Sequence, residues 1–262
     1  MVLFKHQLQV YLNFVRAQSN HAPQKFIIFG RGRSGSTTLV SLLNCLPEID
    51  CDGEILAQPV LWPQLYLKAR AAQAHNSVYG CKLLSYQLRD THQIRQGSDF
   101  LYELSQAGVS ILYLRRENLL EHAISNIRAR SFGFHQSKFH QSNFRTGVQQ
   151  EKIYVEPKAV VDWMEKSQRL WEYELSLLRD IPYMALTYEK NLASETQHQP
   201  TIDAICRFLG IQSTPAVSKY QKVSPQTLQA SVENYGELVY YLKSTPYERY
   251  LDVCPALSTA AC

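Results

Sequence analysis

The sequence predicts a three-layer α/β/α fold with a central, mainly parallel sheet and extra helices toward the C-terminus. Short apolar segments alternate with longer segments of helical periodicity along the chain. This alternation is typical of a parallel sheet that is covered by helices on both faces. The first apolar segment leads into a glycine-rich turn and then into a helical pattern. A chain of 262 residues can build one such core, and we expect a single domain over residues 1–262.

The elements follow one another from strand to helix. In the first half the pattern predicts a helix over 2–18, a strand over 25–29, helices over 36–46 and 60–74, and a strand over 77–84. In the second half it predicts a helix over 98–107, a strand over 109–114, a helix over 117–130, an irregular segment over 131–152, a helix over 157–180, a strand over 182–187, a helix over 201–209 and further helices after 225. Ligands of such a sheet bind at the carboxyl ends of its strands.

Charge and composition exclude several classes of function. The formal charge of +4 comes without a dense run of Lys and Arg, so we expect no nucleic-acid partner. No apolar stretch reaches the length of about 18 residues that a membrane span needs, and the first strand begins too early to leave room for an N-terminal anchor. The six cysteines form no C-x-x-C pair, which favours free thiols in a reducing compartment. We therefore expect a soluble, cytoplasmic protein.

The glycine-rich turn has the frame of a phosphate-binding P-loop. Gly30 and Gly35 enclose four residues, so backbone amides and a helix N-terminus can converge there on an anion. A nucleotide triphosphatase carries Lys and then Ser or Thr after the second glycine, whereas this chain has Ser36 and Thr37. Arg33 instead places a fixed cation inside the loop. The sequence thus predicts a P-loop-like domain whose ligand has one short anionic arm and no metal.

The loop also resembles that of a known family. Arg33-Ser34-Gly35-Ser36-Thr37-Thr38-Leu39 is similar to the 5′-phosphosulfate loop of sulfotransferases that use PAPS (3′-phosphoadenosine-5′-phosphosulfate), in particular the small soluble bacterial ones. The resemblance implies PAPS as co-substrate, adenosine 3′,5′-bisphosphate as product, and no metal. It implies that the donor is bound by Arg33, Ser34, Gly35, Ser36, Thr37 and Thr38.

A second anion site is expected after strand 109–114. Family members hold the 3′-phosphate with an Arg after this strand and a Ser about eight residues later. Ser125 fits the second position, and the spacing favours Arg116 slightly over Arg115, although the start of the helix could favour Arg115. Tyr188 lies in a segment similar to the family's Tyr-Glu-Asp-Leu, whose Tyr approaches the adenine; Lys190 replaces the Asp here.

The catalytic candidates are Arg33, Glu54 and Lys82. Arg33 suits the stabilisation of charge on the departing 5′-phosphate, because its guanidinium does not give up a proton. Glu54 lies in the segment 51–56, expected to be a loop, about twenty residues after the glycine-rich turn; small bacterial sulfotransferases have a Glu there, which implies a general base. Lys82 lies at a strand end, where it can help at the donor. Leu84 occupies the position of the His base found in other family members.

These residues predict a sulfotransferase that acts on a hydroxyl of a small molecule, with a secondary metabolite or glycolipid as the narrower expectation. Residues 131–152 contain aromatic side chains among amides, and a loop of this length is typical of a substrate lid. Two alternatives stay open, a P-loop kinase that acts on a small substrate and a non-catalytic nucleotide-binding protein. The sequence does not identify the acceptor or the oligomeric state.

Overall fold

The computed structural model describes residues 2–16, 23–131, 151–217 and 227–251. The chain divides into two compact units. The first, here called the sheet unit, comprises Met1–Arg115 and Tyr173–Tyr220. The second, the helical unit, comprises Arg116–Glu172 and Gln221–Cys262. The expectation of one domain over the whole chain stays a prediction.

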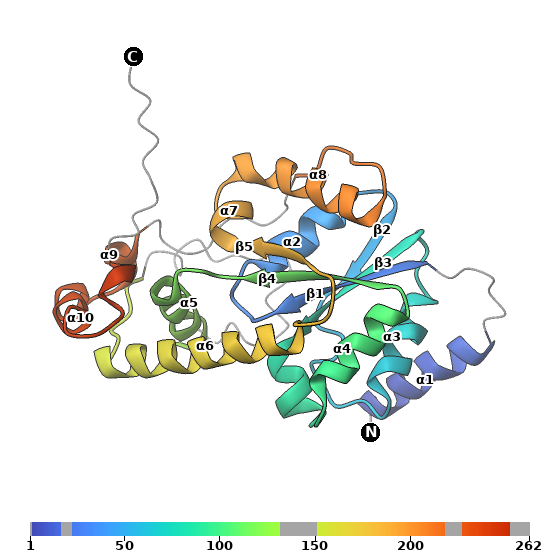
Figure 1. The fold of residues 1–262 in the computed structure, drawn as a ribbon, viewed down its shortest axis with the longest axis horizontal. Helices are drawn as coiled ribbons and strands as arrows, with labels where there is room; N and C mark the ends of the chain where they lie inside the picture. The colour runs from blue at the N-terminus through green and yellow to red at the C-terminus, as the bar shows by residue number, and fades with distance from the viewer. Residues whose placement is uncertain (1, 17–22, 132–150, 218–226, 252–262) are drawn as a thin grey trace, which may run out of the picture. The chain divides into compact units, whose positions relative to one another are not determined.

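A five-stranded parallel sheet forms the centre of the sheet unit (Figure 1), with the strand order β2-β3-β1-β4-β5. The strands are β1 (Gln24–Gly30), β2 (Ile49–Asp52), β3 (Val78–Leu84), β4 (Val109–Arg115) and β5 (Met184–Thr187). Their buried apolar runs explain why they occupy the middle of the fold, because a strand covered on both faces has no polar side.

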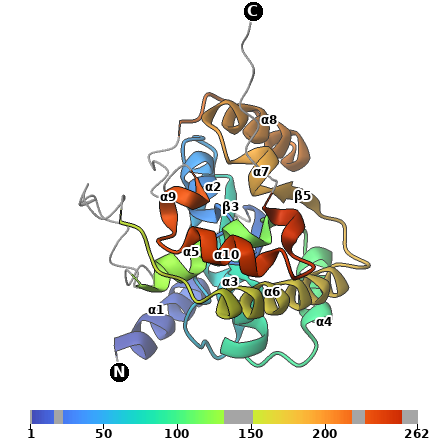
Figure 2. The same ribbon diagram turned by 90° about the vertical axis from the view of Figure 1, so that its left-hand side faces the viewer.

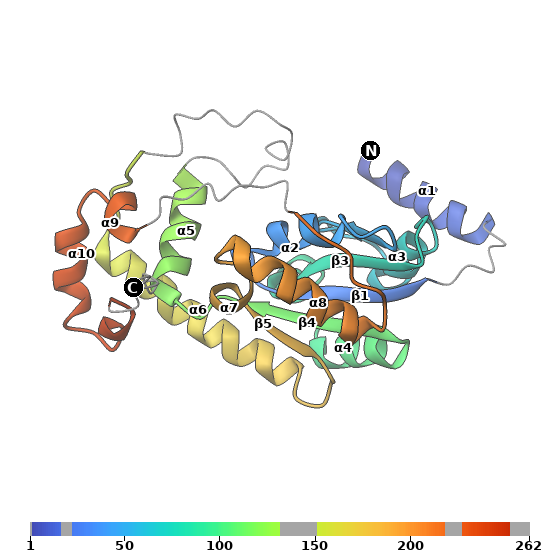
Figure 3. The ribbon, with the colours of Figure 1, turned by 90° about the horizontal axis from the view of Figure 1, so that it is seen from above.

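Helices cover both faces of this sheet, which confirms the predicted three-layer α/β fold (Figures 1 and 3). One apolar cluster joins Phe26 and Ile28 of β1 to helices α2 (Ser36–Leu43) and α8 (His198–Leu209). On the opposite face lie α3 (Pro63–Ala71) and α4 (Gly97–Gln106), beside Ile27 and Cys81. Helix α1 (Val2–Arg16) packs on α3. Alternate residues of β1 therefore face different helices.

Four predicted strands are confirmed as β1, β3, β4 and β5, and one strand was missed. The segment 51–56 was expected to be a loop, but Cys51 and Asp52 belong to β2. This strand has four residues and lies at the edge of the sheet, so it is too short to show a period of two. The predicted helix over 60–74 is shorter, and the short helices α7 (Tyr188–Asn191), η1 (Gln87–Thr91) and η3 (Glu195–Gln197) were not predicted.

The helical unit contains the expected extra C-terminal helices (Figure 2). It is built from α5 (Leu119–Ser131), most of α6 (Pro157–Leu177), α9 (Leu228–Ser231) and α10 (Tyr235–Leu242). A separate apolar cluster holds them together, with Leu120 of α5, Met164 of α6 and Leu238 of α10 fully buried in it. The short helix η4 (Glu248–Tyr250) packs on the same cluster. Each unit thus has its own core.

Candidate functional site

Most of the predicted site residues lie at the carboxyl edge of the sheet. The glycine-rich loop follows β1, Glu54 lies two residues after β2, Lys82 is near the end of β3, Arg115 ends β4 and Tyr188 follows β5. All of these residues belong to the sheet unit. Because every strand is parallel, all five ends meet at one edge, which is the usual ligand edge of such sheets.

The loop from Arg31 to Gly35 has a backbone conformation that its glycines make possible. Gly30 has φ 146°, and a Cβ there would collide with the carbonyl oxygen of Leu114 on β4. Gly35 has φ 86° and Arg33 has φ 65°, a left-handed conformation that is unfavourable for a residue with a side chain. Arg33 is exposed and Ser34 is buried. The loop therefore turns sharply and carries the Arg33 side chain on its surface.

Helix α2 begins directly after this turn, so the first backbone amides of the helix adjoin the turn. The N-cap residue is Gly35, and Leu39 donates its N–H to the Gly35 carbonyl to start the helix. A glycine N-cap provides no side-chain acceptor for the first amides. These amides, together with the positive end of the helix dipole, form a site that an anion can satisfy.

Lys82 and Glu54 meet beside this helix end. The buried Lys82 places its Nζ 3.4 Å from Thr37 Oγ1 and 3.4 Å from Glu54 Oε1. The Lys82 N–H also donates to the Gly53 carbonyl at 3.0 Å, which extends the β2–β3 pairing and fixes the residue before Glu54. Three residues that were singled out separately in the sequence thus form one group, a hydroxyl, an ammonium and a carboxylate.

Gln87 is a site residue that the sequence analysis missed. Its fully buried side chain accepts from the Leu84 N–H at 3.0 Å and donates from Nε2 to Glu54 Oε2 at 3.4 Å. Glu54 is therefore held at one oxygen by Lys82 and at the other by Gln87. Gln87 begins a π-helical turn, a feature that often marks functional sites. A lone Gln in an unperiodic segment gave no sequence signal.

Tyr86 also lies next to this group. Burial raises the pKa of the Tyr86 hydroxyl, and the charge of Glu54 raises it further. The phenol stays protonated at neutral pH and can donate a hydrogen bond. The half-exposed Tyr86 ring therefore offers an aromatic surface beside the carboxylate.

The predicted adenine-binding Tyr188 lies against the loop. It is the first residue of α7, whose N-cap Thr187 ends β5 and accepts from the Lys190 N–H. A Cβ added to Gly35 would stand 2.8 Å from Tyr188 Cδ2. The ring and the loop thus pack together only because residue 35 is a glycine.

The residues of the predicted second anion site fall into both units. Arg115 is the last residue of β4, directly after Leu114, which pairs with Gly30. Arg116 and Ser125 belong to the helical unit, where Arg116 Nη2 lies 2.5 Å from Glu121 Oε2 on the first turn of α5. Ser125 is half-buried on α5. The choice between Arg115 and Arg116 stays a prediction.

Three further expectations concern the substrate lid, metal binding and membrane-spanning helices. Residues 132–150 of the expected lid lie outside the described residues. Within the described ranges, no group of three or more His, Cys, Asp and Glu side chains could hold a metal ion. Among the helices of that same part of the chain, none is both long and apolar enough to cross a membrane. The expectations of a lid and of a metal-free reaction stay predictions.

No family model matches this chain, and no curated protein matches it. Among solved structures, the chain is similar to a sulfotransferase from Alicyclobacillus acidocaldarius, with 14% sequence identity and a TM-score of 0.47. The similarity covers 87% of this chain and 95% of the other.

Proposed function

We propose that this chain is a PAPS-dependent sulfotransferase that transfers a sulfuryl group to a hydroxyl of a small-molecule acceptor. One observation carries the proposal. A P-loop frame without its lysine opens onto the N-terminus of α2, where Lys82 contacts both Thr37 and Glu54. A cation and a carboxylate beside an anion loop are the groups that such a transfer needs.

Each group has a role in this proposal. The amides from Ser34 to Thr38 and the Arg33 guanidinium bind the 5′-phosphosulfate and stabilise the charge that develops on the phosphate. Lys82 adds a buried cation at Thr37. The acceptor oxygen forms a bond to sulfur while the bond from sulfur to the bridging phosphate oxygen breaks, by analogy with loose phosphoryl transfer. Glu54 takes the proton of the acceptor hydroxyl.

Other residues are proposed to hold the adenine and the 3′-phosphate of the donor. We propose that the Tyr188 ring approaches the adenine, because it lies against Gly35 of the loop. For the 3′-phosphate we propose Ser125 and either Arg115 or Arg116, on the resemblance of the segment after β4 to the family's second anion site. An arginine is suited to this contact because its guanidinium can bind phosphate through two hydrogen bonds.

Calorimetric titration with adenosine 3′,5′-bisphosphate tests the proposal, with ATP as the competing ligand. We expect the bisphosphate to bind at least about tenfold more tightly than ATP, which corresponds to about 1.4 kcal/mol, and we expect a chelator to leave its binding unchanged. Lys82→Met should weaken binding, while Lys68→Met, at an exposed position on α3, should not.

Two results would count against the proposal. Equal or tighter binding of ATP that a chelator abolishes would favour the P-loop kinase, which needs Mg²⁺ to hold the phosphates. Absence of bisphosphate binding by the folded wild-type chain would remove the donor altogether.

A further inference from the structure

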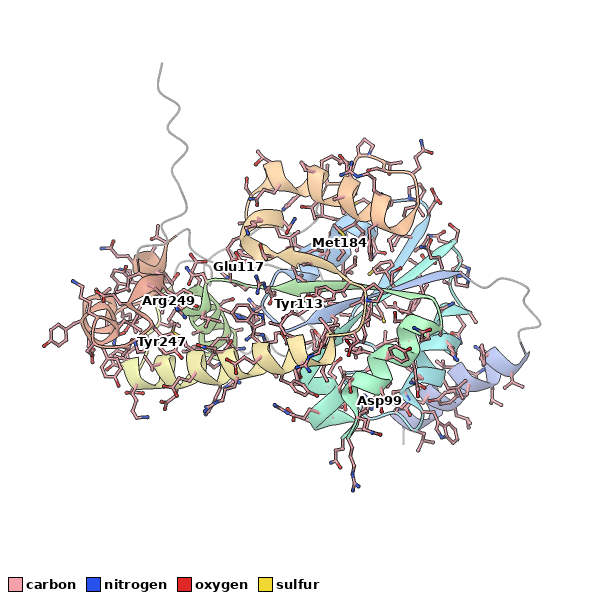
Figure 4. The ribbon with its side chains drawn as sticks, in the orientation of Figure 1. Asp99, Tyr113, Glu117, Met184, Tyr247 and Arg249 are labelled. Carbon is pink, nitrogen blue, oxygen red and sulfur yellow. The ribbon has the colours of Figure 1, made fainter. Side chains whose placement is uncertain are left out.

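A buried polar cluster lies directly behind the glycine-rich loop. It consists of Arg31, Ser85, Tyr113 and Glu174, all in the sheet unit. Arg31 follows β1, Ser85 follows β3, Tyr113 lies on β4 (Figure 4), and Glu174 lies in the last turn of α6. Two of the four are therefore the first residues after neighbouring strands. None of them has a part in the reaction proposed above.

The carboxylate of Glu174 joins the other three side chains. Its Oε1 accepts from Ser85 Oγ at 2.6 Å and lies 3.6 Å from Arg31 Nε. Its Oε2 accepts from Tyr113 Oη at 2.9 Å. Glu174 has no exposed surface, and Arg31 is 7% exposed. This is a buried ion pair whose anion also has two hydroxyl donors.

Such a pair is a weak source of stability. Removing two charges from water has a free-energy penalty that their attraction often does no more than offset, and apolar replacements of similar size are often as stable. Burial raises the pKa of the Glu174 carboxyl, while Arg31 and the two hydroxyl donors act in the opposite direction. Stability alone is therefore a poor reason for this cluster, and its position suggests another.

We propose that Glu174 is a positioning residue for the anion loop and that it acts through Arg31. Arg31 is the first residue of the loop, directly after Gly30, where the backbone passes close to Leu114. Its side chain reaches into the core to Glu174, while the backbone continues to the left-handed Arg33 and to Gly35. The contact fixes the loop to the sheet at its first residue, so that the amides keep the arrangement that binds an anion.

The hydroxyls of Ser85 and Tyr113 have a supporting part in this inference. They hold the two carboxylate oxygens from the end of β3 and from β4, the two strands that flank β1 in the sheet. The carboxylate is thus aligned with the strands on both sides of the loop. Loss of one hydroxyl should loosen this alignment less than loss of the carboxylate charge.

The test is a double-mutant cycle on loop order and on ligand binding. Glu174→Gln keeps the side-chain shape and removes the charge, Arg31→Met removes the partner, and the double variant measures their coupling. The first readout is hydrogen exchange of the backbone amides from Gly32 to Ser36, with the amides of β5 as internal reference. The second readout is affinity for adenosine 3′,5′-bisphosphate. Glu103→Gln, at an exposed position on α4, is the matched control.

We expect Glu174→Gln to speed exchange in the loop and to weaken ligand binding roughly tenfold, with little further change when Arg31→Met is added. The reference amides and Glu103→Gln should remain like the wild type. If Glu174→Gln does not fold, Tyr113→Phe and Ser85→Ala test the same alignment and should give smaller effects of the same direction.

Several outcomes would overturn the inference. Unchanged loop exchange in the folded Glu174→Gln variant would do so, as would effects of the two single variants that simply add. A uniform acceleration of exchange through the sheet unit would show that the cluster only stabilises the fold. The affinity readout rests on the proposed function, whereas the hydrogen-exchange readout does not. If the wild type fails to bind the bisphosphate, the proposed function fails and the hydrogen-exchange readout still decides the role of Glu174.

Discussion

At the scale of single residues, Lys82 adds a buried cation beside the glycine-rich loop. A nucleotide triphosphatase carries its phosphate-binding lysine within the loop itself, but here Ser36 follows Gly35. Lys82 comes from β3 and reaches Thr37 and Glu54 with its buried ammonium. A cation fixed by the sheet has less freedom than one on a loop. It also couples the loop to a carboxylate, since the two oxygens lie at equal distances of 3.4 Å from Nζ.

Arg33 is the residue for which activity and stability can be separated most cleanly. Its charge is proposed to act on the departing phosphate, while its φ of 65° disfavours any residue with a Cβ. We expect both Arg33→Ala and Arg33→Gly to abolish transfer and to retain the fold. The Gly variant should be the more stable of the two, by up to about 1 kcal/mol, because glycine accepts the left-handed conformation.

Transfer assays and urea unfolding of the two Arg33 variants check this expectation. A large loss of unfolding free energy in Arg33→Gly would show that the side chain has a structural role. Retained transfer in either variant would remove Arg33 from the mechanism.

Glu54 can be tested by a change that keeps its contact with Lys82. The amide oxygen of Glu54→Gln can still accept from Lys82 Nζ, so the contacts of Lys82 should persist, whereas the amide nitrogen cannot accept from Gln87 Nε2 as the carboxylate does. We expect turnover to fall about 10²-fold or more, because a general base contributes typically 10²–10⁴-fold, with donor affinity little changed.

Turnover and donor binding are measured on the same preparation, with Glu103→Gln on α4 as control. Turnover close to wild type would place the base elsewhere. Normal turnover with weaker donor binding would mean that Glu54 serves only to hold Lys82.

At the scale of elements, the turn from β1 into α2 could be predicted because its signal is local. A buried apolar run, closely spaced glycines and a helical pattern occur within twenty residues, and each has a meaning that does not depend on distant contacts. Glu54 and Lys82 could likewise be identified as candidates, each from its own segment of the sequence. The contacts of Lys82 with Glu54 and with Thr37 depend on the strand order β2-β3-β1, which local patterns do not specify.

The features that the sequence analysis missed share a physical cause, because they depend on contacts with distant parts of the chain. Strand β2 is four residues long and is recognisable by its pairing with β3. Gln87 and Glu174 obtain their roles from residues far along the chain, such as Glu54 and Arg31. A glutamate in an amphipathic helix is normally read as a solvent-facing residue, so the burial of Glu174 had no sequence signal.

Strands β1 and β4 approach each other closely at Gly30, so alanine substitutions at Gly30 and Gly32 should differ in their effect on stability. At Gly30 a Cβ would collide with the Leu114 carbonyl, and φ is 146°. At Gly32 the nearest atom would be Leu84 Cδ1 at an ordinary 3.8 Å, and φ is not in the left-handed range. We expect Gly30→Ala to lower the free energy of unfolding by about 3 kcal/mol and Gly32→Ala to change it by less than about 0.5 kcal/mol.

Urea denaturation of both variants measures the difference. Equal effects of the two substitutions would show that the loop leaves β1 by another path. A stable Gly30→Ala protein with lost ligand binding would mean that the loop had shifted to accept the methyl group.

At the scale of the whole molecule, the two units divide the proposed site residues between them. The sheet unit contains the anion loop, Glu54, Lys82, Arg115 and Tyr188. Arg116 and Ser125 belong to the helical unit, whose apolar cluster is separate. The residues proposed for the sulfuryl end of the donor therefore all belong to the sheet unit. Most of the buried charge that the fold has to accommodate there lies at Glu174, Arg31 and Lys82.

Buried Glu174 should make global stability depend on pH in a direction opposite to that of a typical carboxylate. Burial raises the pKa of Glu174 above its usual 4.5, while Arg31, Ser85 and Tyr113 oppose the rise; Tyr173 is the other titratable neighbour. Between the unfolded and the folded pKa, the native state binds the additional proton. The contribution of this proton to stability is complete below pH 4.5 and is lost as the pH rises through the folded pKa of Glu174.

The Glu174→Gln substitution removes this titration. We expect the stability advantage of the wild type over Glu174→Gln to decrease from pH 4.5 upward and then to become constant once the folded carboxyl is ionised. Urea unfolding of both proteins across this range measures it, and an advantage that grows with pH would show instead that the ion pair with Arg31 outweighs the burial of the carboxylate.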